Sequence, residues 1–299
     1  RGNVQTPLIV RAPLPVDPGV GAALGRWGLG QGDGVGSAAP LDLVTLGPAP
    51  CTRACPAGIQ VKRYVGLVAE GRYEEALAVV RSANPMAAVS GYLCHRPCET
   101  ECACGDEGRP IPIRALKHLA ARVVEETGQP PQAPSCSSEA GRVAVVGGGP
   151  AGLTAARDLR LLGYGVTIFE SGQSLGGLLA RAVPERRLPR WALEADIAYI
   201  LAHGVELRLS TAVRGPGEAR ALLDQGFDAV LWATGAGAGV CASMPGGGAG
   251  GLVPAMPLLE SLAGGGEPPP FGQALVIGAG QAGLALATEL AIRGRGKVT

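Results

Sequence analysis

Apolar positions recur at helical spacing in the first half of the chain. The stretches at 59–83 and 112–126 both place apolar side chains three or four positions apart. The first stretch predicts two short helices separated at Gly71, and the second predicts one helix closed by Gly128. Residues 1–50 are rich in glycine, proline and alanine and keep neither period, which predicts a linker or a disordered lead-in.

From residue 142 the pattern changes to short apolar runs that alternate with helical segments. Strands are predicted at 142–146, 165–170, 205–209 and 228–233, and helices at 150–162, 190–202 and 216–223. Strands that alternate with helices predict a parallel, doubly wound sheet. A further apolar strand at 274–278 begins a second unit of the same kind.

The charge balance narrows the class of protein. Among 299 residues, 26 basic and 25 acidic side chains give a net charge of +1, so neither nucleic acid nor an anionic membrane is expected as a partner. No uninterrupted apolar run reaches about 18 residues, and no secretory leader opens the sequence. We therefore expect a cytoplasmic protein with no membrane span, whose 8 cysteines stay reduced. Because the chain opens on Arg1 and stops within the second α/β unit, we also expect it to be a fragment of a longer protein.

A glycine-rich loop, GGGPAG, follows the first predicted strand and opens the next helix. Gly147 permits the tight turn, Gly149 lets a pyrophosphate approach the backbone, and Gly152 lets helix and strand pack closely. Phosphate is attracted to the positive end of the helix, and Glu170 ends the next strand, where a carboxylate can bind ribose hydroxyls. The dinucleotide site predicted from this pattern consists of Gly147, Gly149, Pro150, Ala151, Gly152 and Glu170.

The first loop alone does not separate FAD from NAD, but two later segments do. With SLGG at 174–177 and WATG at 232–235, the sequence resembles the flavoproteins that have two dinucleotide-binding domains. The resemblance implies that the first loop takes FAD. It also implies that Thr234 and Gly235 mark the passage from the FAD domain to the nicotinamide domain.

A second loop of the same type follows the strand predicted at 274–278. Its position predicts an inserted NAD(P)H-binding domain. The residue that separates NADH from NADPH would lie on the next strand, beyond Thr299, so the sequence leaves both nucleotides open. The predicted contacts are Gly278, Gly280, Gln281, Ala282 and Gly283.

Cysteines crowd into the helical segment. Cys51 and Cys55 precede a run in which three residues separate Cys94 from Cys98 and Cys98 from Cys102. Thiolates at such spacings can surround one inorganic core, either an iron–sulfur cluster or zinc. A cluster is favoured because it gives a flavin an outlet for single electrons, whereas zinc is redox-inert.

Residues from Pro50 to Thr299 resemble the glutamate synthase small (β) subunit family. The resemblance rests on segments such as APCTRACPAGI, GYLCHRPCETECACG and RPIPIRALKHLAA, and the same iron–sulfur module heads dihydropyrimidine dehydrogenase. It implies one [4Fe–4S] cluster, with Cys51 as the remnant of a second and Cys104 as an extra thiol or an alternative ligand. The implied cluster ligands are Cys55, Cys94, Cys98 and Cys102.

The same resemblance implies further FAD contacts outside the first loop. Gly176, Gly177 and Leu178 would touch the flavin nucleotide. Arg187 would contact its pyrophosphate or ribose, and Val213 would contact the adenine through its backbone.

The predicted fold class is α/β with an N-terminal all-α iron–sulfur domain. A doubly wound, Rossmann-like FAD-binding domain follows, and then the start of an inserted, Rossmann-like NAD(P)-binding domain. The predicted boundaries are 1–50 for the lead-in, 51–128 for the helical [4Fe–4S] domain, 129–141 for a linker, 142–240 for the FAD-binding domain and 241–299 for the start of the NAD(P)H-binding domain.

The resemblance implies an oxidoreductase that passes electrons from NADH or NADPH through FAD and the cluster to a partner subunit or domain. The acceptor would be a glutamate synthase large subunit, ferredoxin or a similar protein. Hydride transfer needs no acid–base residue, so no catalytic side chain is predicted. Two alternatives remain: a non-catalytic cofactor-bearing scaffold or redox-sensing subunit, and a disulfide reductase like thioredoxin reductase. A glutathione-reductase-like form is excluded because residues 142–240 contain no cysteine.

Overall fold

The structure, a computed structural model, describes residues 48–105, 108–128, 140–236, 251–294 and 296–299. Most of the predicted lead-in and most of the predicted linker lie outside the described residues. Contacts join Pro48–Thr299 into one unit.

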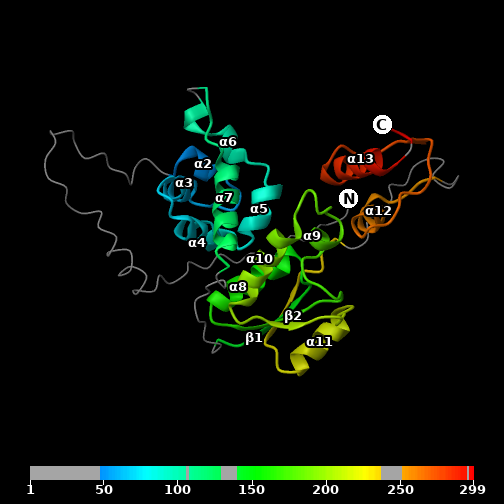
Figure 1. Cartoon of the computed structure of the whole chain (residues 1–299). Coiled ribbons are helices and arrows are strands. Elements are labelled where there is room, and N and C mark those ends of the chain that lie inside the picture. The colour runs from blue at the N-terminus through cyan, green and yellow to red at the C-terminus, as the bar shows by residue number, and fades with distance from the viewer. Residues whose placement is uncertain (1–47, 106–107, 129–139, 237–250, 295) are drawn as a thin grey trace. The chain divides into compact units, whose positions relative to one another are not determined.

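Helices make up the first part of this unit (Figure 1). They are α2 (Pro50–Arg53), α3 (Val61–Ala69), α4 (Tyr73–Ala83), α5 (Ala87–Leu93), α6 (Pro97–Thr100) and α7 (Ile113–Glu126), with a 3₁₀ turn at Ala103–Gly105 between the last two. The predicted break at Gly71 is confirmed, because this residue has φ +75° between α3 and α4. Helices α5 and α6 were not predicted, because both are short and contain alanine, glycine or proline rather than a periodic apolar face.

The second part contains a four-stranded parallel sheet. Its strands are β1 (Arg142–Val146), β2 (Gly165–Phe169), β3 (Glu206–Arg208) and β4 (Ala229–Trp232), in the order β3-β2-β1-β4. Val143 pairs with Val166 of β2 on one side and with Ala229 of β4 on the other. The predicted parallel sheet is confirmed.

Helices cover both faces of this sheet. Figure 1 shows α8 (Pro150–Leu161) and α10 (Arg190–Leu201) on one side and α11 (Pro216–Asp224) on the other. Successive β1 residues alternate between these layers: Val143 and Val145 join the core with Leu153 of α8, whereas Ala144 and Val146 pack with Leu222 of α11. Each large side chain buried in these layers stabilises the fold by about 1.5–3 kcal/mol. The sheet is therefore doubly wound.

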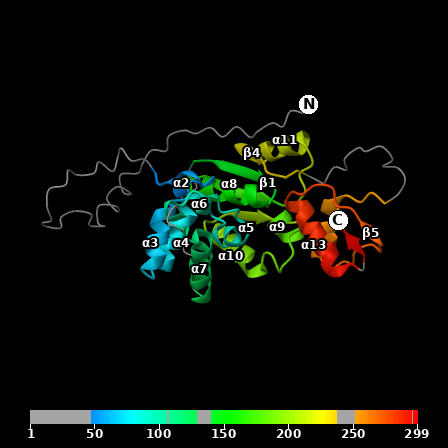
Figure 2. The same cartoon turned by 90° about the horizontal axis from the view of Figure 1, so that it is seen from above.

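A second, smaller α/β unit ends the chain. It comprises α12 (Ala255–Ala263), β5 (Gln273–Ala274), α13 (Gln281–Arg293) and β6 (Lys297–Val298), with β5 and β6 parallel and α13 beside them (Figure 2). The strand predicted at 274–278 is wrong in extent, since β5 spans only Gln273–Ala274. The strand is short because its partner β6 comprises only two residues. Beyond β5, Val276 N–H still donates to the Thr299 carbonyl at 2.8 Å.

Within the described residues, no helix has both the length and the apolar character needed to cross a bilayer.

Candidate functional site

Backbone segments approach one another closely around the first glycine loop. Gly147 has φ +110°, and a Cβ atom built there would overlap the carbonyl of Ala233. A Cβ on Gly152 would overlap the Gly147 carbonyl in turn. Both positions require glycine for a close approach, as the sequence motif predicts.

The N-terminal end of α8 is open to a ligand. Gly149 is the N-cap with extended backbone, Pro150 is the first helical residue, and no side chain caps the helix start in the described chain. The nearest atom to a Cβ built on Gly149 would be the Gly177 Cα, at 3.8 Å, an ordinary contact distance. Free N–H groups at the positive end of a helix bind phosphate, so this loop fits a dinucleotide.

Glu170 lies directly beside the loop. Its Oε2 accepts a hydrogen bond from Gly148 N–H at 2.7 Å, and its Oε1 accepts one from Gly172 N–H at 2.7 Å. Ser171 Oγ also donates to Oε1 at 3.2 Å. A carboxylate has about four acceptor sites, so about one remains for a ribose hydroxyl.

The SLGG and WATG segments meet the same loop. Gly176, with φ +107°, donates its N–H to the Gly148 carbonyl at 2.8 Å, and Gly177 follows with φ +54° before α9 (Leu178–Arg181) begins. Thr234 Cα is 3.1 Å from the position of a Cβ on Gly147. Gly235 has φ +77° just past β4.

Val213 is partly buried and packs against the apolar cluster on the α11 side of the sheet, which contains Ala144, Val146, Phe169, Leu222 and Phe227. The predicted flavin residues Gly176, Gly177 and Thr234 lie against the first loop, whereas Arg187 has a different neighbour.

Arg187 is placed against the second loop instead. Its Nη2 donates to the side-chain carbonyl of Gln281, the first residue of α13. The neighbouring Arg186 forms an ion pair with the fully buried Glu289, which also pairs with Arg293 at 3.1 Å. These contacts join the segment before α10 to α13.

The second loop repeats the backbone of the first. Gly278 has φ +108°, Gly280 is an extended N-cap, and a Cβ on Gly283 would overlap the Gly278 carbonyl. Gln281 and Ala282 open α13 as Pro150 and Ala151 open α8. This loop therefore fits a second dinucleotide.

Three of the predicted thiols share one region of the helical domain. Burial raises the pKa of Cys98 to about 11, with further contributions from Cys94 and Cys55. The side chain of Lys117, only 4% exposed, lies within electrostatic range of the same three thiols; burial lowers its pKa and the thiols oppose that shift. A buried cation offsets the negative charge that thiolates bring to an iron–sulfur site.

The turn after α5 directs a backbone N–H group at the sulfur of Cys94. Arg96 has φ +55°, and its N–H donates to Cys94 Sγ at 3.2 Å. Arg114 binds the same turn, because its Nη1 donates to the Cys94 carbonyl at 3.2 Å. Hydrogen bonds to sulfur are among the features that tune iron–sulfur sites.

Cys102 has different neighbours. Its pKa is lowered chiefly by a hydrogen bond from the Ile111 backbone, and further by bonds from Cys104 and Gly105. Within the described part of the chain, no three His, Cys, Asp or Glu side chains lie close enough to hold a single metal ion. Cys94 and Cys55 lie within electrostatic range of Cys98, whereas Cys102 is hydrogen-bonded to Ile111, Cys104 and Gly105. Soft thiols, backbone N–H donors and a buried lysine nevertheless make a donor set that fits an iron–sulfur cluster.

The sequence prediction missed two buried charges, Lys117 and Asp196. Lys117 lies on the buried side of α7 with Ile113, Ala120 and Ala121. Asp196 is fully buried on α10. In both cases the available signal was a charged residue at an apolar position of a helical pattern.

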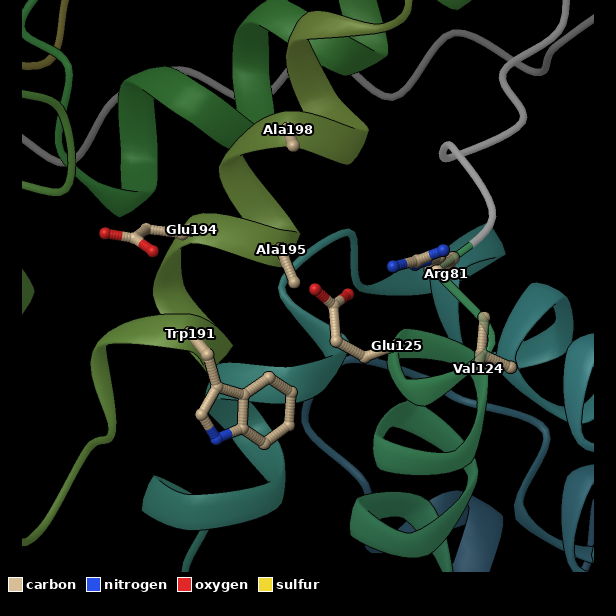
Figure 3. A pocket seen from close by; sticks show the side chains of 8 residues that line it. Arg81, Val124, Glu125, Trp191, Glu194, Ala195 and Ala198 are labelled. Carbon is tan, nitrogen blue, oxygen red and sulfur yellow. The ribbon is translucent and has the colours of Figure 1, made fainter.

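A cavity of about 280 Å³ lies beside α10 (Figure 3). Trp191, Glu194, Ala195 and Ala198 line it from α10, and side chains of α4 and α7 line the opposite wall. None of the predicted cofactor residues is among its lining residues.

Comparisons with known proteins agree with this geometry. Residues 141–299 match the family described as pyridine nucleotide-disulphide oxidoreductase, and residues 45–129 match the dihydropyrimidine dehydrogenase domain II family with a 4Fe-4S cluster. The expected [4Fe–4S] cluster, FAD and pyridine nucleotide are confirmed by these matches, as is the assignment to the oxidoreductases.

Several curated proteins are similar to the chain. The NADP(+)-dependent formate dehydrogenase subunit beta of Moorella thermoacetica is 36% identical in a 259-residue alignment that covers 78% of this chain and 36% of that protein. The NADPH-Fe(3+) oxidoreductase subunit beta of Geobacter sulfurreducens is 37% identical over 63% of this chain and 28% of its own length. The glutamate synthase [NADPH] small chain of Mycobacterium tuberculosis is 33% identical over 62% of this chain and 38% of its own length.

The chain spans about a third of the length of these relatives. Its match to the first family nevertheless covers both glycine loops and the sheet between them. The chain therefore belongs to the pyridine nucleotide-disulphide oxidoreductase family and carries a helical iron–sulfur domain ahead of its nucleotide-binding loops.

Proposed function

We propose that the chain passes electrons from NADH or NADPH to a partner subunit or domain. The second loop binds the pyridine nucleotide, the first loop holds FAD, and the thiols of the helical domain hold a [4Fe–4S] cluster. FAD, when bound, links two-electron hydride transfer to one-electron transfer. The observation that carries this proposal is the presence of two glycine loops with the same backbone geometry behind one set of thiols.

The chain's own residues bind and orient the cofactors. Gly147 and Gly152 allow the close backbone approach that forms the turn at the start of α8, and Glu170 fixes the loop through Gly148 N–H. No side chain is assigned a proton-transfer role. In the helical domain, the proposed cluster ligands are Cys55, Cys94, Cys98 and Cys102.

The partner is proposed from the chemistry of the relatives. They include beta or small subunits of formate dehydrogenase and glutamate synthase, so an acceptor subunit such as a glutamate synthase large subunit, or ferredoxin, fits the exit of single electrons. A cytoplasmic location goes with this proposal, because a reducing compartment keeps cysteines available as cluster ligands.

The test measures flavin bleaching together with metal content. NAD(P)H should bleach the bound flavin under anaerobic conditions, and a low-potential dye should then accept the electrons. The protein should contain about four irons and matching acid-labile sulfide per flavin. Zinc in place of iron would overturn the cluster, and flavin that never bleaches would favour a non-catalytic scaffold.

Two cysteine variants locate the cluster. Cys98→Ala should remove nearly all iron, because Cys98 is a proposed ligand that lies close to Cys55 and Cys94. The matched control, Cys104→Ala, changes an exposed cysteine and should keep the iron. Equal loss of iron in both variants would require a different set of ligands.

A further inference from the structure

A carboxylate of the flavin domain caps a helix of the iron–sulfur domain. Asp196 of α10 is fully buried. Its Oδ1 accepts a hydrogen bond from Ala88 N–H at 3.2 Å, and its Oδ2 accepts one from Val89 N–H at 2.8 Å. These two residues belong to the first turn of α5, whose own N-cap, Met86, makes no side-chain capping bond within the described part of the chain. Asp196 thus supplies from another domain what a capping residue normally supplies locally.

The capped helix ends at a thiol. α5 has seven residues, and Cys94 is its C-cap. A helix rises about 1.5 Å per residue, so only about 10 Å separate the two ends of α5. Because α5 is this short, a displacement of its first turn should also displace Cys94.

Aromatic contacts hold the far end of the same helix. The Tyr92 ring lies 4.6 Å from the His118 ring of α7 and 6.1 Å from the Trp191 ring of α10. Two side chains of α10 therefore contact α5: Asp196 contacts the first turn of α5, and Trp191 contacts Tyr92 near the C-terminal end of α5.

The surroundings of Asp196 explain how a buried carboxylate is tolerated. Burial raises its pKa to about 7, whereas the two N–H donors and the cations Arg81 and Lys117 lower it. Removing a carboxylate from water is costly unless it is hydrogen-bonded. The N–H groups of Ala88 and Val89 can both donate to Asp196 only when the first turn of α5 lies beside this carboxylate. Loss of these bonds would leave the buried carboxylate without its α5 donors, so the observed position of α5 is favoured.

We propose that Asp196 is a positioning residue that fixes α5, and with it the Cys94 thiol, against the flavin-binding domain. The role of Cys94 as a cluster ligand rests on the proposed function, whereas the fixing of α5 does not.

Hydrogen exchange of the α5 amides tests the proposal in the full chain. In Asp196→Ala, exchange at Ala88 and Val89 should be about tenfold faster or more, because both amides lose a charged acceptor. Asp196→Asn should restore part of the protection, since an amide oxygen can still accept one bond. This variant also keeps the test valid should the alanine variant not fold.

A matched variant separates positioning from general loosening of the interface. The Tyr199 ring lies 4.0 Å from the Arg81 guanidinium and 4.9 Å from the His203 ring, and neither of these partners belongs to α5. Tyr199→Leu should weaken the contact between α10 and α4 and leave exchange at Ala88 and Val89 within about twofold of wild type. Equal exchange in Asp196→Ala and wild type, or equal acceleration in Tyr199→Leu, would overturn the proposal.

The spectrum of the reduced cluster gives a second readout. Displacement of Cys94 should change the electron paramagnetic resonance signal in Asp196→Ala, with partial return in Asp196→Asn, and Tyr199→Leu should keep the wild-type signal. A protein without iron would contradict the proposed function, while the exchange measurements would still decide the role of Asp196. An unchanged signal in iron-containing Asp196→Ala would overturn the link to Cys94.

Discussion

The two glycine loops have the same backbone and different surroundings. Gly147 and Gly278 have φ values of +110° and +108°, and the two N-cap glycines have φ values of −80° and −74° with ψ near −180° in both. A Cβ on Gly147 would overlap the Ala233 carbonyl, whereas no atom of the described residues lies within 4 Å of a Cβ on Gly278. The backbone that follows β4 thus packs against the first turn, whereas no described residue packs against the second turn at Gly278.

The neighbouring side chains differ in the same way. The strand before the first loop is buried, whereas Leu275 and Ile277 before the second are 72% and 66% exposed. Glu170 binds the first loop, and Arg187 binds the residue that opens the helix after the second. The comparison shows that the same glycine spacing gives the same turn in two places whose neighbouring side chains differ.

Alanine at the first position of each loop should show the largest difference. Gly147→Ala combines strain at positive φ, about 1–2 kcal/mol, with overpacking of about 1–3 kcal/mol against Ala233, so unfolding should become easier by about 3 kcal/mol. Gly278→Ala should cost only the strain, about 1–2 kcal/mol. Chemical denaturation measures both, and equal losses would show that the enclosure of the first loop contributes nothing.

The free energy of unfolding should depend on pH through Asp196, which lies in the same domain as the first loop. The folded pKa of Asp196, about 7, lies above the unfolded value near 4, so folding takes up a proton between these values. Stability is then fully present below about pH 4 and falls as the pH rises to 7, by about 1 kcal/mol per pH unit. Denaturation of wild type and Asp196→Asn at pH 5, 6 and 7 should show this slope in wild type alone; parallel curves would contradict it.

Glu170→Gln should weaken FAD more than the pyridine nucleotide. The variant replaces one acceptor oxygen with a donor that faces the N–H of Gly148 or Gly172, so FAD affinity should fall about tenfold. Binding of NAD(P)H should stay within about twofold, since the second loop is untouched. Flavin fluorescence and nucleotide titration measure the two affinities, and a matched fall in both would contradict the assignment of Glu170 to the first loop alone.

Arg187→Ala should have the smallest effect and assign this side chain to one loop. An exposed side chain that bonds to Gln281 should change nucleotide affinity by only about twofold to fivefold. Arg187→Lys, which keeps the charge, serves as the control. A fall in FAD affinity without a change in nucleotide affinity would support the FAD contact that the sequence predicts for Arg187.

Periodic and motif-bearing segments were predictable, whereas spatial neighbours were not. The parallel sheet follows from alternating strands and helices, and both loops follow from glycines whose conformation is set locally. α5, α6 and α12 lack a long periodic face and were not predicted. The hydrogen bonds that Cys102 receives from Ile111, Cys104 and Gly105 could not be read from the cysteine spacing, because Ile111 lies nine residues further along the chain.

The cap that Asp196 places on α5 bears on how the helical module can be reused. A graft of residues 51–128 onto a foreign reductase would leave two amides of the first α5 turn without an acceptor. A recipient scaffold would need a carboxylate at the matching place on its docking helix. The helical module and α10 are thus best exchanged between proteins as a pair.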